Sequence, residues 1–131
     1  MASPKAAAPR ERLVLLDANA LMTAARLRID LARGLSAAAP GWTAVVPSCV
    51  GRELESLGAR RHAREARALA KGFPAFEAEG KGDDAIIEAA SAGPRRAVLT
   101  NDRDLRRRLR RRGVPVLFVR GSAGLAVDGT L

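Results

Sequence analysis

The segment Leu13-Val14-Leu15-Leu16-Asp17 decides the fold of this chain, because four consecutive apolar residues end directly on an acid. A continuous apolar run of this length is typical of a strand that is buried on both faces, as in a parallel sheet. After Asp17, the residues Ala18, Met22 and Ala25 recur at the spacing of one helix face. The segment therefore predicts a buried strand followed at once by a helix, which we expect to continue to Gly34.

The same alternation of apolar runs and helical patterns continues along the chain. Further strands are expected over residues 43–46, 73–77 (a short edge strand), 97–100 and 116–119, and further helices over residues 48–58, 59–71, 83–91 and 102–112. Strands that alternate with helices predict an α/β fold, a three-layer sandwich around a central, mostly parallel sheet of four to five strands. We expect a flexible leader over residues 1–11, one domain over residues 12–120 and a C-terminal tail over residues 121–131.

The composition narrows the setting in which the protein acts. The chain has 131 residues, a formal net charge of +9 and 47% apolar residues, so it predicts one folded, strongly basic domain. Such a charge favours polyanionic partners, and nucleic acid is the commonest of these in cells. The sequence contains no apolar run of 18 residues and no signal-peptide pattern, so we expect no membrane-spanning segment and no membrane partner. A basic protein at a membrane surface is the alternative that the charge leaves open. The single cysteine, Cys49, excludes an internal disulfide, and we expect a cytoplasmic protein.

Four acids stand where predicted strands end or helices begin. They are Asp17, Glu53, Asp84 and Asp102. The carboxyl ends of parallel strands share one edge of the sheet, so these carboxylates are expected to converge there. Two unit charges 4 Å apart repel by roughly 4 kcal/mol at an effective dielectric constant near 20. One or two Mg²⁺ or Mn²⁺ ions relieve such repulsion and prefer oxygen ligands, so we predict that the four acids are metal ligands and catalytic residues.

Each acid also has a plainer interpretation. An aspartate at Asp17 or Asp102 can simply cap a helix, and Glu53 can be a solvated residue near a helix start. The pair Asp83-Asp84 opens a helix that needs one cap, so Asp84 is taken as the ligand and Asp83 as the cap or a supporting partner. The polar residues expected to surround the acids without binding the metal directly are Asn19, Asp83, Thr100, Asn101 and Asp104.

Basic residues recur at helical spacing in two places. The first set is Arg60, Arg64, Arg67 and Lys71, and the second begins at Arg103, Arg106 and Arg107 in the arginine-rich stretch up to Arg112. A solvated helix surface would also explain such residues. The excess of arginine over nearby acid instead favours binding to RNA phosphates, with little intrinsic base preference.

Several motifs together resemble the PIN domain, a family of small metal-dependent ribonucleases. They are Leu15-Leu16-Asp17-Ala18-Asn19, the segment 46–54, Asp83-Asp84-Ala85-Ile86 and the segment 99–105. The likeness extends from Leu13 to Val119. It implies Asp17, Glu53, Asp84 and Asp102 as the acidic set, Asn19 and Thr100 as polar neighbours, and a homodimer. Ala18 stands where the family often has threonine or serine, and this departure leaves the acidic set intact.

Within that family, the arginine-rich segment after Asp104 is most similar to the archaeal and eukaryotic branch related to ribosomal RNA processing factors. The VapC toxins form the neighbouring branch, so the resemblance implies either a ribosome-assembly partner or an antitoxin. We predict a metal-dependent endoribonuclease that cleaves RNA by water attack. One alternative is a catalytically silent PIN-like scaffold that binds RNA or protein in ribosome biogenesis, and another is a Toprim-like nuclease built on Asp102 and Asp104.

Overall fold

The computed structural model describes residues 11–121 and 124–131, and a six-stranded sheet forms the centre of this part of the chain. The strand order is β3-β2-β1-β4-β5-β6. The strands are β1 Leu13–Leu16, β2 Thr43–Pro47, β3 Ala75–Phe76, β4 Arg96–Leu99, β5 Val116–Val119 and β6 Leu125–Asp128. The first five are parallel to one another, whereas β6 pairs antiparallel with β5. The prediction of an α/β sandwich with a mostly parallel sheet is confirmed.

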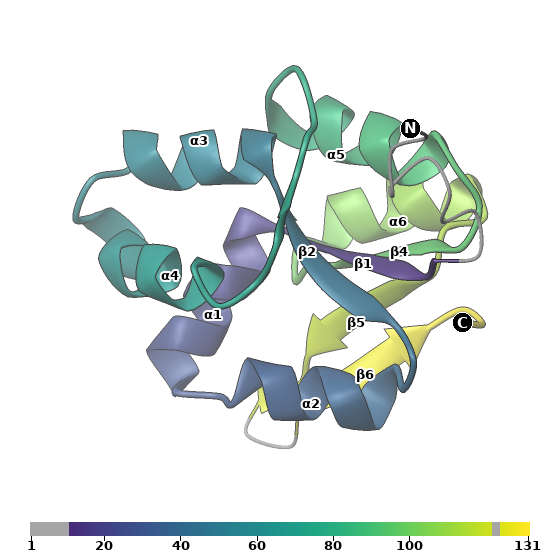
Figure 1. The fold of residues 1–131 in the computed structure, drawn as a ribbon, viewed down its shortest axis with the longest axis horizontal. Coiled ribbons are helices and arrows are strands. Elements are labelled where there is room, and N and C mark those ends of the chain that lie inside the picture. Colours follow the sequence, from purple (N-terminus) through teal and green to yellow (C-terminus); the bar gives the residue numbers. More distant parts are fainter. Residues whose placement is uncertain (1–10, 122–123) are drawn as a thin grey trace, which may run out of the picture.

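Helices cover both faces of this sheet (Figure 1). They are α1 Ala18–Leu27, α2 Leu31–Ala38, α3 Ser48–Ser56, α4 Ala63–Ala70, α5 Gly82–Ser91 and α6 Arg103–Arg111, with a short 3₁₀ turn, η1, at Arg60–His62. Helices α5 and α6 pack on β4 and β5 from one face, and α1 and α2 lie on the other face (Figure 1). Helix α4 packs against α1 and α3 at the end of the molecule away from β6. Among the described residues, no helix combines the length and apolar composition that a membrane crossing needs.

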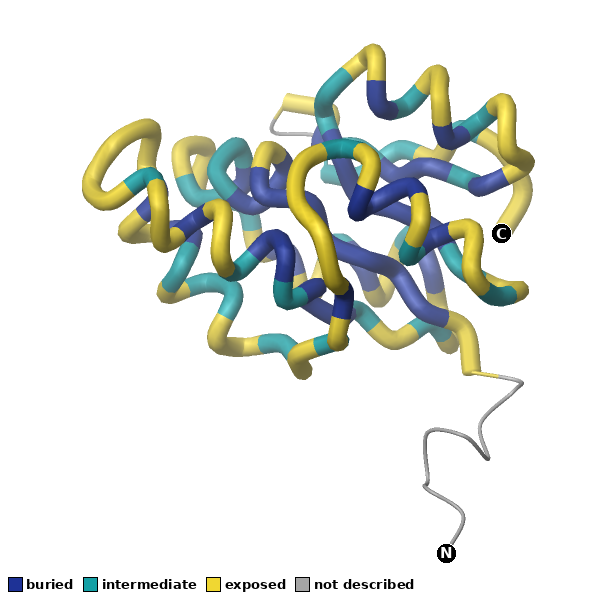
Figure 2. Tube along the Cα trace, turned by 90° about the horizontal axis from the view of Figure 1, so that it is seen from above, coloured by how far each residue is buried: buried dark blue, intermediate teal, exposed yellow. Residues whose placement is uncertain are grey.

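The core lies between the sheet and these helices. All four residues of β1 are buried, and Leu15, Leu16 and Leu99 are completely inaccessible to solvent. In Figure 2 the strands run through the middle of the molecule as buried segments, while the exposed residues gather on the outer turns of the helices. This central position explains the continuous apolar run, since β1 has sheet neighbours on both sides and helices on both faces.

The helix predicted from Asp17 to Gly34 is in fact two helices, α1 and α2. Arg28 closes α1 in the left-handed conformation, with φ of 57°, and the Asp30 side chain accepts a hydrogen bond from Arg33 N at 3.2 Å to start α2. The prediction of one helix was wrong because the apolar spacing continues across the break. A capping aspartate inside an apolar periodic stretch is the local feature that marks the new start.

The helix predicted over residues 59–71 is also interrupted. Arg61 and His62 are both left-handed, so η1 precedes a shorter α4 that begins only at Ala63. At the C-terminus, part of the expected tail over residues 121–131 is strand β6, which raises the sheet to six strands rather than four or five. Its sequence, Leu125-Ala126-Val127-Asp128, is less continuously apolar than that of β1 or β5, so it did not predict a strand. The expected leader, apart from residue 11, lies outside the described residues.

Candidate active site at the carboxyl edge of the sheet

Asp17 and Asp102 meet through Thr100, at the point where β1 and β4 end side by side. The Asp17 amide donates to Leu99 O at 3.0 Å, which carries the sheet pairing to the last residue of each strand. The Thr100 hydroxyl donates to Asp17 Oδ2 at 2.7 Å and accepts from the Asp102 amide at 3.1 Å. Thr100 is completely buried, so it holds both aspartates in a fixed relation. The Asp102 backbone therefore lies within one hydroxyl group of the Asp17 carboxylate.

Asp17 is a buried carboxylate with few polar contacts. Only 6% of the residue is exposed, and although it precedes α1 its side chain makes no capping hydrogen bond. Helix capping, the plainer interpretation of this residue, therefore does not account for it. Burial raises its pKa to about 6, and the charges of Glu53 and Asp83 add to this increase, while the hydrogen bond from Thr100 opposes it. Negative charge at Asp17 thus lacks the solvation that it would have in water.

Glu53 and Asp83 approach Asp17 from α3 and α5. Partial burial raises the pKa of Glu53, and the charge of Asp83 raises it further. Partial burial likewise raises the pKa of Asp83, followed by the charge of Asp102. Asp83 thus acts on both Asp17 and Glu53, and Asp102 acts on Asp83, so the four carboxylates form a chain of neighbouring charges. We refer to Asp17, Glu53, Asp83 and Asp102 as the acidic cluster.

In the structure Asp83, rather than the predicted Asp84, neighbours the other acids of this cluster. The Asp84 side chain is 86% exposed, and its Oδ1 accepts from Arg108 Nη2 at 2.6 Å. Neither aspartate caps α5, because the helix begins at Gly82 and its N-cap residue is Lys81. Consecutive helical residues point about 100° apart, so only one of the two can face the sheet edge. The sequence pattern did not reveal which one.

Asn19 and Asn101 join the segments around the acidic cluster. Asn19 Oδ1 accepts from the Asn101 amide at 3.1 Å, which links α1 to the loop before α6. The Asn101 side chain donates to Val119 O at 2.9 Å and accepts from Val119 N at 2.8 Å. This side chain thus forms the two hydrogen bonds with β5 that the backbone of a neighbouring strand would form. Asp104 instead pairs with Arg107 on the exposed side of α6. Asp102 does cap α6, since its Oδ1 accepts from Leu105 N at 3.0 Å.

The acidic cluster offers only carboxylate oxygens, which are the type of donor atom that a hard divalent cation prefers. A buried, poorly solvated Asp17 beside further acids is the setting in which such a cation relieves repulsion. Among the described residues, however, no three carboxylate, imidazole or thiolate groups stand close enough in this structure to bind one ion together. Asp102 is held by its capping contact, whereas no described residue contacts the Glu53 side chain by a hydrogen bond or ion pair.

The arginines of α6 line a cleft of about 540 Å³ beside β6. Its lining residues are Arg103, Arg106, Arg107, Arg110, Arg111 and Asp128. Arg106 lies 4.1 Å from the centre of the Phe118 ring and pairs with Asp128 at 2.9 Å, so its position is fixed. Arg103 and Arg107 are exposed. The cleft begins at the N-terminus of α6, beside the acidic cluster, and contains five arginines against one acid.

The predicted basic stripe on α4 is divided between two roles. Arg60 donates to Leu57 O and Ser56 O, and Arg67 Nη1 donates to Leu54 O and Gly58 O at 2.7 Å each. Both arginines therefore satisfy carbonyls at the C-terminal end of α3, where a helix leaves its last four acceptors unpaired. Arg64 and Lys71 are exposed. The interruption at η1 also removes Arg60 from the α4 surface, so the four residues do not form a single stripe.

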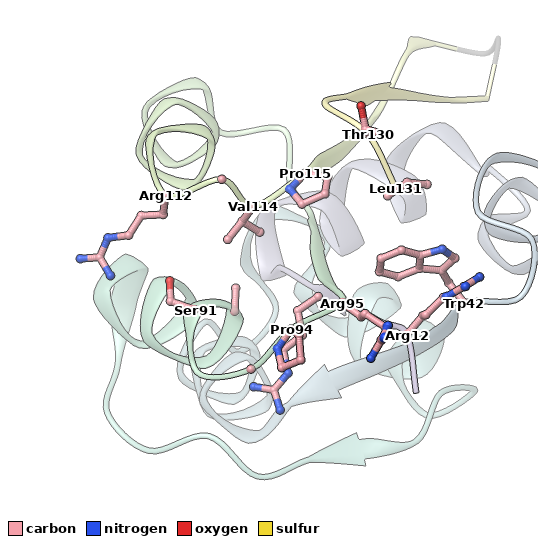
Figure 3. Close-up of a pocket in the computed structure, with 14 residues that line it drawn as sticks. Arg12, Trp42, Ser91, Pro94, Arg95, Arg112, Val114, Pro115, Thr130 and Leu131 are labelled. Atoms are coloured by element: carbon pink, nitrogen blue, oxygen red, sulfur yellow. The ribbon is translucent and has the colours of Figure 1, made fainter. Parts of the chain in front are cut away.

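A second cavity, of about 490 Å³, lies at the amino ends of the strands (Figure 3). It is lined by Arg12, which precedes β1, by Arg96 at the start of β4, and by Pro115 just before β5, with Trp42 on one side. Arg96 is held in place, because its Nη1 donates to Ala89 O at 2.6 Å. No member of the acidic cluster lines this cavity, which lies at the opposite ends of the strands.

Comparison with known proteins agrees with this arrangement. A family model described as a PIN like domain matches residues 14–122. The chain is 31% identical over 90 residues to Ribonuclease VapC9 of Archaeoglobus fulgidus, and the match covers 64% of this chain and 66% of that protein, just under two thirds. A solved structure of the PIN domain endonuclease Utp24 superimposes with a TM-score of 0.77 and 28% identity, covering 91% of this chain and 92% of that one. With most of its length matched by the family model and its fold shared with a solved member, this chain belongs to the PIN-like domain family.

Proposed function

We propose that this protein is a metal-dependent endoribonuclease that cleaves RNA phosphodiesters by attack of water. The acidic cluster is the observation that carries the proposal, because three acids from other elements, Glu53, Asp83 and Asp102, lie around the buried Asp17 carboxylate. The similarity to proteins named as a ribonuclease and an endonuclease supports the reaction class. The basic cleft on α6 supports RNA as the substrate, since phosphate contacts dominate the affinity for nucleic acids.

Mg²⁺ or Mn²⁺, as one or two ions, is the proposed cofactor. Asp17 and Asp102 would hold it, with Glu53 and Asp83 completing the set in place of the predicted Asp84. The chemistry that such an ion supplies when bound is activation of water and stabilisation of the leaving oxygen. The protein's own contribution is positioning, because Thr100 fixes the Asp17 carboxylate and the backbone of Asp102.

RNA binding is assigned to the exposed arginines of α6 and to Arg64 and Lys71 on α4. Arg103 and Arg107 are one helical turn apart and point away from the core, so a strand can follow them out of the acidic cluster. Arg106 contributes positive charge from a fixed position over Phe118. We no longer assign Arg60 and Arg67 to RNA binding, because their guanidinium groups donate hydrogen bonds to backbone carbonyls at the end of α3.

We place the activity in RNA processing of the ribosomal type, the setting that the resemblance of the arginine-rich segment implies, and the fold shared with the PIN domain endonuclease Utp24 supports a nuclease. A toxin-type ribonuclease is the second candidate, favoured by the likeness to VapC9. The first setting calls for a ribosome-assembly partner and the second for an antitoxin. In either case we propose a cytoplasmic protein that acts as a homodimer, as the family resemblance implies.

The decisive experiment incubates the purified protein with a mixture of structured RNAs in Mn²⁺ or in EDTA and maps the new ends. The expected products carry 5′-phosphate and 3′-hydroxyl ends, because water rather than the 2′-hydroxyl attacks. The variant Asp17→Asn should abolish cleavage while RNA affinity is retained or increases. Cleavage that continues in EDTA would contradict the metal proposal, and wild-type binding without any cleavage would identify the silent scaffold.

A further inference from the structure

A small pocket of about 320 Å³ lies between α1 and the turn η1. Helix α1 contributes Asn19, Met22, Thr23 and Arg26, and the turn contributes Arg61 and His62. Its volume is near the lower limit, about 300 Å³, of typical ligand pockets, so it has room for one nucleotide unit and little more. No residue of the α6 cleft lines it, so it is a separate feature of the surface.

The pocket adjoins the acidic cluster through Asn19. This residue lies two positions after Asp17, and its side-chain oxygen accepts from the Asn101 amide at 3.1 Å. The Thr23 hydroxyl donates to Asn19 O at 2.9 Å, so these two lining residues belong to the same turn at the start of α1. In Figure 1, α6 lies over β4 and β5, whereas α4 and its preceding turn pack on α1 at the opposite end of the molecule. The α6 cleft and this pocket therefore flank the acidic cluster.

The turn that forms one wall has an unusual backbone. Arg61 has φ 52° and ψ 35°, and His62 has φ 63° and ψ 24°, so two successive residues with side chains adopt the left-handed conformation. Glycine adopts this conformation without steric cost, and the chain uses it nearby at Gly58, with φ of 60°. Among the described residues this is the one place where two consecutive non-glycine residues are left-handed, and backbone strain is concentrated at functional sites.

The charge of the pocket is uncompensated. Arg26 and Arg61 are both exposed, and no described residue forms an ion pair with either of them. No carboxylate is among the lining residues. Two guanidinium groups beside an imidazole ring match a nucleotide, because arginine binds phosphate through paired donors and a histidine ring can stack on an unpaired base.

We propose that the η1 pocket, formed by Asn19, Met22, Thr23, Arg26, Arg61 and His62, binds one nucleotide of single-stranded RNA beside the scissile position. Arg26 and Arg61 hold its phosphate, and the His62 ring stacks on its base above Met22. The inference rests on the proposed function and deepens it. The RNA strand then crosses the acidic cluster from the η1 pocket to the α6 cleft, so the substrate is unpaired at the cleaved bond.

The test compares Arg61→Gly with Arg28→Gly. Both residues are exposed arginines with left-handed backbones, at φ 52° and φ 57°, but Arg28 does not line the pocket. Each substitution lowers the formal net charge from +9 to +8 and relieves the same kind of backbone strain, so both variants should melt no lower than wild type. Binding of a fluorescent single-stranded RNA oligonucleotide is measured in EDTA, where cleavage is not required.

Arg61→Gly should weaken binding by roughly fivefold to tenfold relative to Arg28→Gly at 0.1 M salt. It should also lower the slope of log K against log salt by about 0.7, the value for one lost contact to a single strand. Equal affinities of the two variants would overturn the inference, whatever the nuclease assay shows. If wild type binds RNA through this pocket yet never cleaves it, the proposed function fails and the pocket assignment stands.

Discussion

Asp17 is a residue whose ionisation destabilises the folded state, because folding buries its carboxylate. Its pKa is about 6 in the folded protein against an ordinary value of 3.8, mainly because burial removes water from the carboxylate. Below pH 3.8 the group is protonated in both states and contributes nothing to the pH dependence. Between these values the unfolded chain ionises first, so the folded state loses stability as the pH rises. Above pH 6 the full penalty, about 3 kcal/mol, is present.

We therefore expect the metal-free protein in EDTA to lose stability between pH 4 and pH 7, and Asp17→Asn to lose much less. The variant should be more stable than wild type at pH 7.5 by about 2–3 kcal/mol, since the amide carries no charge to bury. Chemical denaturation across this pH range checks both statements. Glu53 and Asp83 shift in the same direction and leave a smaller residual slope. A variant with the same pH profile as wild type would show that Asp17 is not the source.

Asp83 and Asp84 form a matched pair for testing the assignment of the acidic cluster. Asp83→Asn should reduce metal-dependent cleavage by at least about 100-fold, because it removes a carboxylate that interacts with Glu53 and Asp102. Asp84→Asn should leave cleavage within about threefold of wild type, since it alters only an exposed ion pair with Arg108. Rates measured at saturating Mn²⁺ decide between the two. The reverse order would restore the assignment made from sequence.

At the scale of elements, α3 depends on arginines that follow it in the chain. Arg67 reaches from α4 to Leu54 O and Gly58 O, and its side chain is only 25% exposed. These contacts close the end of the helix that carries Glu53 and join α3 to α4. The sequence pattern assigned Arg67 to RNA because helical spacing records which face a residue occupies, not which carbonyls lie within its reach.

Arg67→Ala should lower the free energy of unfolding by about 2–3 kcal/mol, because it removes charge-assisted hydrogen bonds from a partly buried helix end. Arg64→Ala, an exposed neighbour on the same helix, should change it by less than about 0.5 kcal/mol. Urea denaturation of the two variants makes the comparison. Equal losses in the free energy of unfolding would show that the hydrogen bonds from Arg67 to the α3 carbonyls do not stabilise the fold.

At the scale of the whole molecule, β6 completes the basic cleft. The strand pairs with β5 over four residues, and Leu125 packs against α2, as its side chain lies 3.2 Å from the position that a Cβ on Gly34 would occupy. Asp128 pairs with Arg106 and Arg110, and these arginines lower the pKa of its carboxyl group. The C-terminal strand thus holds two arginines of α6 in place and contributes the one negative charge in the cleft.

Asp128→Asn should increase RNA affinity roughly twofold to fivefold at low salt, because it removes the acid that competes with phosphate for Arg106 and Arg110. Glu88→Gln is the control, since it alters the net charge equally from an exposed position on α5. Binding isotherms at several salt concentrations separate the two effects. Equal affinity gains in both variants would show that only net charge matters, and weaker binding by Asp128→Asn would mean that the paired arrangement itself binds RNA.

The parallel α/β framework, and the sheet edge to which the acids belong, could be predicted from local sequence patterns. Buried strands must be apolar throughout, and the carboxyl ends of parallel strands must share one edge, so Leu13–Leu16 and the acid after it predicted both. Which of two neighbouring residues faces the other acids depends instead on packing in the folded protein. The packing of α5 leaves Asp84 exposed beside Arg108 and Asp83 partly buried, and the Arg67 side chain turns to the Leu54 carbonyl of α3. These outcomes depend on contacts between segments far apart in the chain, and no local pattern encodes them.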